Sequence, residues 1–227
     1  MKVLVLGLFA EGPTDHNFLP LVIQRTAEQI LAQHEQSGMY EASVLIMRLT
    51  KDQKKDRAES ILQAAYDACG YHALIVHADA DDPEPHKARS ERIEPGFRLI
   101  LETDENVCRD LVAIIPVQAI EAWILADYEL LLREVGTDLK AYDLEIPETA
   151  KYVQRISKPK KRLEQAVQKA YASRSKRRRE IDINFLYQPI GEKINLDLLK
   201  QVPSYKQFVE DLTETLINLN LIRRVDR

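Results

Sequence analysis

Apolar runs of strand length alternate with stretches of helical periodicity over the first half of the chain. Residues 3–9 are an apolar run that predicts a buried strand, and residues 16–35 carry apolar side chains near helical spacing. The pattern then repeats, because residues 41–49 predict a second strand and residues 52–69 a second helix. The sequence therefore begins with two strand–helix units.

A third and a fourth strand are predicted at residues 71–78 and 111–117, with a polar loop and a helix over residues 93–107 between them. Strands that are apolar on both faces and alternate with helices are typical of a parallel sheet that is covered on two sides. We therefore expect an α/β, Rossmann-like fold with a four-stranded, mainly parallel sheet and helices on both faces.

The second half of the chain predicts helices only, over residues 119–133, 159–172 and 205–219. We expect two parts, an α/β domain over residues 1–135 and a helical C-terminal extension over residues 136–227 that packs on it.

Composition narrows the class of protein. A 45% hydrophobic and 30% charged chain is in the ordinary globular range. Two cysteines, Cys69 and Cys108, are too few for a disulfide framework or a cysteine-ligated metal cluster.

No apolar stretch approaches the roughly 18 residues that a membrane span requires. We expect a cytoplasmic protein without a membrane segment. Its net charge of -4 implies that any contact with nucleic acid is local.

Carboxylates follow the first and third predicted strands. Glu11 stands in EGPTD, while Asp79 and Asp81 stand in HADADD and share one side by period-two alternation. Sites of parallel α/β folds lie beyond the carboxyl ends of the strands. Acids that converge there repel unless a cation lies between them, and hard oxygen ligands suit Mg²⁺ or Mn²⁺. The sequence predicts such a metal, which could clamp a transferring phosphate or activate a water.

Other interpretations of the same acids stay open. An acid after a strand is often only a helix cap, and a D-x-D pair also occurs in sugar-nucleotide transferases and haloacid-dehalogenase phosphatases. The phosphatase pattern fits poorly, because Asp81 is followed by Asp82 and Pro83 rather than by glycine and threonine.

The EG-x-T-D and D-x-D elements resemble the Toprim domain of primases, topoisomerases and overcoming-lysogenization-type nucleases. PVQAIEAWILAD at 116–127, with KPKK at 158–161, looks like a bacterial Toprim-like family of uncharacterised function. The resemblance implies a Toprim-like fold in which Glu11 is the catalytic acid and a metal ligand. The other implied metal ligands are Asp79, Asp81 and Glu121. Asp15, His77, Asp82 and Asp127 could contact the metal ligands from further out. Each of them could instead be a helix cap or form hydrogen bonds only within the protein.

The implied activity is Mg²⁺-dependent hydrolysis of phosphodiester bonds in DNA or RNA. The chain lacks the flanking modules of topoisomerases and primases, which leaves a nuclease. It also lacks a GxxxxGK[ST] loop, so the resemblance implies a separate ABC-like ATPase partner and a role as effector of an antiphage system. The alternative is a noncatalytic subunit of an ATPase complex that binds nucleic acid or regulates the complex.

Two basic runs in the helical half are candidates for binding nucleic acid or a partner. They consist of Lys158, Lys160, Lys161 and Arg162, and of Arg174, Lys176, Arg177, Arg178 and Arg179. A run of this kind is also common on an ordinary solvated helix face.

Overall fold

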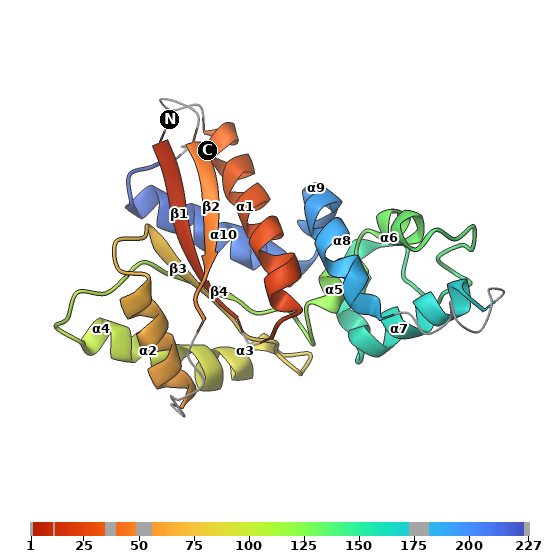
Figure 1. Cartoon of the computed structure of the whole chain (residues 1–227), viewed down its shortest axis with the longest axis horizontal. Helices are drawn as coiled ribbons and strands as arrows, with labels where there is room; N and C mark the ends of the chain where they lie inside the picture. Colours follow the sequence, from red (N-terminus) through yellow and green to blue (C-terminus); the bar gives the residue numbers. More distant parts are fainter. Residues whose placement is uncertain (1, 11, 35–39, 49–55, 173–181, 225–227) are drawn as a thin grey trace.

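Four parallel strands form the central sheet of the computed structural model, which describes residues 2–10, 12–34, 40–48, 56–172 and 182–224. The strands are β1 (Lys2–Phe9), β2 (Tyr40–Ile46), β3 (Ala73–His77) and β4 (Leu111–Ile114). Their order is β2-β1-β3-β4, and every pairing is parallel (Figure 1). The expected α/β fold is confirmed.

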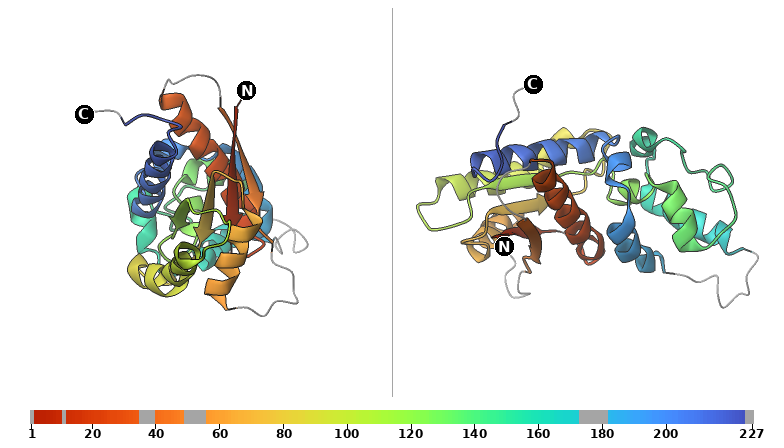
Figure 2. Two further views of the ribbon diagram at one scale, coloured as in Figure 1. Left: turned by 90° about the vertical axis from the view of Figure 1, so that its left-hand side faces the viewer. Right: turned by 90° about the horizontal axis from the view of Figure 1, so that it is seen from above.

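Helices cover both faces of the sheet. One face packs against α1 (Asp15–Gln33) and α10 (Pro203–Asn218), and the other against α2 (Arg57–Asp67) and α4 (Glu94–Glu102) (Figures 1 and 2). Neighbouring residues of a strand point to opposite faces, so Ile75 joins the first cluster while Leu74 and Val76 join the second. Because these strands are buried on both faces, they appear in the sequence as continuous apolar runs.

The start of α2 is set by a capping box. Asp56 accepts a hydrogen bond from the backbone N–H of Glu59 at 2.8 Å, and the side chain of Glu59 accepts one from the N–H of Asp56 at 3.3 Å. The helix therefore begins at Arg57, not at residue 52 as predicted, and residues 49–55 lie outside the described part of the chain.

The prediction of a single helix over residues 119–133 is wrong. The chain forms α5 (Glu121–Ile124) and α6 (Tyr128–Val135), separated by a break at 125–127. Asp127 is the N-cap of α6, since its Oδ1 atom accepts from the N–H of Leu130 at 3.1 Å. A capped start at this position forces a new helix to begin.

The remaining helices and helical turns lie between β3 and α4 or between α6 and α10. They are α3 (Pro85–Ala88), the π-helical turn η1 (Arg89–Ile93), η2 (Ala150–Arg155), α7 (Pro159–Ala170), η4 (Ile183–Leu186), α8 (Tyr187–Lys193) and α9 (Leu196–Leu199). Among the described helices, none combines the length and apolar character that crossing a membrane needs.

Helices α5 to α9 gather beside α1, on the right in Figure 1, and share one hydrophobic cluster with the sheet. Arg25 of α1 binds the C-terminal end of α8, because its guanidinium donates to the carbonyl oxygens of Gly191 at 3.0 Å and Ile194 at 2.8 Å. Trp123 of α5 donates to Ser204 of α10 at 2.9 Å. Helices that follow residue 135 thus contact α1 and α5, and the division of the chain into an α/β domain and an extension at residue 135 stays a prediction.

Candidate functional site

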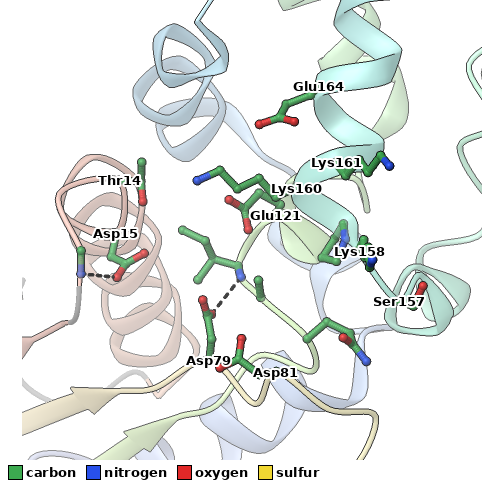
Figure 3. Close-up of a pocket in the computed structure, with 15 residues that line it drawn as sticks. Thr14, Asp15, Asp79, Asp81, Glu121, Ser157, Lys158, Lys160, Lys161 and Glu164 are labelled. Atoms are coloured by element: carbon green, nitrogen blue, oxygen red, sulfur yellow. Dashed lines mark hydrogen bonds between the residues drawn. The ribbon is translucent and has the colours of Figure 1, made fainter.

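The order of the strands places an open pocket beside β1. The chain passes from β1 to β2 on one side and β3 lies on the other side, so the loops that follow β1 and β3 diverge at this point of the sheet. Parallel α/β folds bind ligands at such a switch point. A pocket of about 620 Å³ lies here, and its wall includes Gly12, Thr14, Asp15, Asp79, Asp81, Glu121, Lys158, Lys160 and Lys161 (Figure 3).

Asp15 stands in the first turn of α1, at the pocket wall. Its Oδ2 atom accepts a hydrogen bond from the N–H of Gly12 at 2.8 Å and lies 3.4 Å from Nδ1 of His77. Burial favours a higher pKa for this carboxyl, but His77 and the Gly12 N–H outweigh it, and the pKa of Asp15 is lowered. Asp15 is therefore charged and joins the loop after β1 to the end of β3.

His77 is the last residue of β3 and is fully buried between two carboxylates. Its Nε2 atom lies 3.2 Å from Oδ1 of Asp79, opposite the contact with Asp15. Burial alone would lower the pKa of His77, but the two acids raise it to about 9. The protonated ring of His77 therefore offsets part of the negative charge of Asp15 and Asp79.

Asp79 and Asp81 both line the pocket, but not through strand alternation. Strand β3 ends at His77, so both acids lie in the following loop, and Asp81 has a left-handed backbone with φ 53°. Asp79 accepts a hydrogen bond from the N–H of Ile120 at 3.2 Å (Figure 3), and Asp81 forms an ion pair with Arg92 at 2.8 Å. A turn of the backbone, and not the period-two pattern, brings these acids to one wall.

Glu121 reaches the pocket from the start of α5. It is 4% exposed, and the hydroxyl of Tyr187 donates to its Oε1 atom at 2.6 Å. Burial raises the pKa of Glu121, and the hydrogen bond from Tyr187 opposes this rise. Tyr187 carries no signal of this role in the sequence, because no motif links two residues that are 66 positions apart.

Two of the outer acids accept backbone hydrogen bonds and do not line the pocket. Asp82 is exposed and accepts from the N–H of Glu84 at 2.9 Å. Asp127 caps α6 with one oxygen, and its Oδ2 atom accepts from the N–H of Asn195 at 3.0 Å. Asp127 is thus the helix cap that the sequence left open, whereas Asp82 stabilises the turn before α3 and caps no helix.

Lysines of the first basic run line the same pocket, together with Glu164 of α7. Lys158, Lys160 and Lys161 stand at the start of α7, and Lys160 extends toward Glu121 (Figure 3). Arg162 instead forms an ion pair with Glu145. Glu11 and the second basic run, with Arg174, Lys176, Arg177, Arg178 and Arg179, lie outside the described residues.

The acids of the pocket offer oxygen atoms of the kind that Mg²⁺ binds. Within the described part of the chain, however, no group of three or more histidine, cysteine, aspartate or glutamate side chains is placed to hold a metal ion. Asp81 is held by Arg92, and one oxygen of Asp79 receives the N–H of Ile120. The described residues therefore supply individual oxygen ligands, but they do not form a complete set of ligands for a metal ion.

A comparison with protein families identifies the family of this chain. A family model described as "Domain of unknown function (DUF4276)" matches residues 10–213. Neither the curated proteins nor the solved structures gave a match. The matched residues include every element that lines the pocket, from the loop after β1 to α7. Because the match spans most of its length, the chain belongs to the family described as "Domain of unknown function (DUF4276)".

Proposed function

We propose that this pocket binds and hydrolyses a phosphodiester bond of DNA or RNA with the help of Mg²⁺ or Mn²⁺, as Toprim-like nucleases do. One observation carries the proposal: Asp15 from the start of α1, Asp79 and Asp81 from the loop after β3, and lysines from α7 line one open pocket at the switch point of the sheet. Hydrolysis of a phosphodiester uses both features. Cationic groups bind the phosphate oxygens, and acids hold the metal ion that activates the attacking water.

The lysine wall is suited to a phosphate group. Lys158 is the N-cap residue of α7, a helix of 12 residues, and Lys160 and Lys161 belong to its first turn. The N-terminal end of a helix carries a partial positive charge and unpaired N–H groups that favour anions. Three lysines at this end therefore add full charges where the backbone already favours a phosphate.

The acidic wall is suited to organising the attack. A cation held by Asp79 together with Glu11 and Asp81, and with Glu121 as a further acid, would neutralise the phosphate and lower the pKa of a water. Arg92 would have to share Asp81 with that cation. His77 fixes Asp15 and Asp79, and Tyr187 fixes Glu121, so three pocket acids are oriented by buried partners.

Cleavage assays with purified protein test the proposal. We expect labelled single-stranded DNA, duplex DNA or tRNA to be cut with Mg²⁺ or Mn²⁺ and not with EDTA, and the Asp79→Ala/Asp81→Ala double variant to lose this activity. Asp104→Ala is the matched control, because Asp104 is an exposed acid in the loop after α4. Equal cleavage by the double variant and the wild type would refute the site.

A second candidate is a noncatalytic subunit that binds nucleic acid within an ATPase complex. The observation that favours it is the lack of a complete metal-ligand group among the described residues. In this case the protein binds nucleic acid but cuts none, with any metal and also with an added ABC-like ATPase. Under either proposal the protein works in the cytoplasm, and its role in antiphage defence is part of the proposal.

A further inference from the structure

A second pocket continues the first one around the start of α7. It has a volume of about 450 Å³, and Ser157, Lys158 and Lys161 line both pockets. Since they share three wall residues, the two pockets are neighbours on either side of Ser157, Lys158 and Lys161. An extended ligand bound at Asp79 that passes over these three residues would enter the second pocket.

The second pocket is cationic. Arg155, Lys158, Lys161 and Arg162 line it, and Glu145 is the one acid in its wall. Glu145 is already bound by Arg162 and by Lys169, which lies 2.5 Å away. Within the described residues this leaves Arg155, Lys158 and Lys161 without an acidic partner. Their positive charge is available to a phosphate group.

An aromatic ring stands beside this cationic pocket. Tyr152 is 38% exposed, and the guanidinium of Arg155 lies 4.5 Å from the centre of its ring. Both residues belong to the 3₁₀ turn η2, in which side chains three positions apart lie on the same side. Nucleic-acid bases stack on tyrosine rings and on arginine planes. The ammonium of Lys151 also lies 5.0 Å from the centre of this ring. Tyr152 and Arg155 therefore form a platform, aromatic and cationic, of the chemistry on which an unpaired base stacks.

We infer that the second pocket and the Tyr152–Arg155 platform bind the next nucleotide of a single strand, its phosphate at Arg155, Lys158 and Lys161 and its base against the platform. This assignment rests on the proposed function, because it extends the strand bound at Asp79. It also selects the substrate class. A paired base is stacked inside a duplex and cannot lie on the platform, whereas an unpaired base can.

Fluorescence anisotropy in EDTA, which prevents cleavage, tests this assignment with a labelled single-stranded oligonucleotide, the same strand with abasic sites, and its duplex. We expect Tyr152→Ala to weaken binding of the intact single strand about 10-fold and Tyr152→Phe to leave it within about twofold. Binding of the abasic strand and the duplex should not change in either variant. Arg98→Ala, an exposed arginine of α4, is the control for loss of a surface residue.

The outcomes separate this assignment from the proposed function. If the wild type cuts nucleic acid but Tyr152→Ala binds the intact and abasic strands as the wild type does, the single-strand platform is refuted and the nuclease stands. If no strand is cut but Tyr152→Ala loses affinity only for intact single strands, the platform is supported and the nuclease fails. If the protein binds no strand in EDTA and also cuts none with Mg²⁺ or Mn²⁺, both are overturned.

Discussion

The Nδ1 atom of His77 lies 3.4 Å from the Oδ2 atom of Asp15, in a position that solvent does not reach. This contact joins the end of β3 to the first turn of α1, the two elements whose loops meet at the pocket. A buried cation between two acids keeps the acidic wall in place before any substrate or metal arrives.

We predict that this contact makes stability depend on pH. The pKa of His77 is raised from 6.5 to about 9 in the folded protein, so its contribution is fully present below pH 6.5 and is lost as the pH rises through about 9. Over that window the free energy of unfolding should fall by up to about 1.4 kcal/mol per pH unit for this one proton. Urea unfolding at several pH values, in EDTA, measures it. His77→Gln should lack this slope, and equal slopes in the two proteins would contradict the prediction.

Lys160 should contribute to the salt dependence of nucleic-acid binding. Each phosphate neutralised by a lysine changes the slope of log K against log salt by about 0.7 for a single strand. We expect Lys160→Gln to reduce the slope by about this amount, measured by anisotropy over a salt series. Lys206→Gln on α10 is the control, because Lys206 lines neither pocket and lies 3.7 Å from Glu210. An unchanged slope in Lys160→Gln would place the phosphate elsewhere.

Removal of the Tyr187 hydroxyl should destabilise the protein. Tyr187→Phe leaves the buried carboxyl of Glu121 without this donor, a loss that costs about 1–3 kcal/mol. The cost should be larger at pH 7 than at pH 5, because the raised pKa of Glu121 leaves more of it neutral at pH 5. Urea unfolding of Tyr187→Phe tests this, with Tyr128→Phe as the control, since that hydroxyl makes only an exposed 3.4 Å bond. A cost as small as that of Tyr128→Phe would show that Glu121 finds another donor.

Gly96 allows α4 to lie against α2. A Cβ atom at this position would come within 2.6 to 2.8 Å of three atoms of the buried Ile61. We expect Gly96→Ala to lower stability by about 1–3 kcal/mol through overpacking, although alanine favours a helix by up to about 1 kcal/mol. Thermal unfolding measures the change, and Arg98→Ala on the same helix should stay within about 0.5 kcal/mol of the wild type. A more stable Gly96→Ala would mean that the two helices can separate without cost.

The sheet was predictable because burial on both faces leaves a plain mark on the sequence. Residues 3–9 and 71–78 predicted β1 and β3 to within two residues at every end, since a strand buried on both faces is an uninterrupted apolar run. That Asp79 and Asp81 lie beyond the end of β3, at the carboxyl edge of the sheet, was predictable on another ground, because parallel strands bring their carboxyl ends to one edge.

Partners far apart in the sequence were not predictable. Periodicity tells which side of a helix is buried but not which element covers it, so nothing pointed to Tyr187 as the partner of Glu121 or to Arg92 as the partner of Asp81. The break before α6 was missed because Asp127 stands in an otherwise apolar helical pattern, where a cap and a helix-interior acid look alike.

The packing of α10 on β4 also sets how the chain must fold. Residues 111–114 and 203–218 lie close in space but are separated by the whole of α5 to α9. Closing a loop of that length carries an entropic cost, and contacts so distant in sequence are associated with slow folding. The face of β4 that α10 covers stays exposed until this long-range contact has formed, so a variant that unfolds the helical region should aggregate through that apolar face.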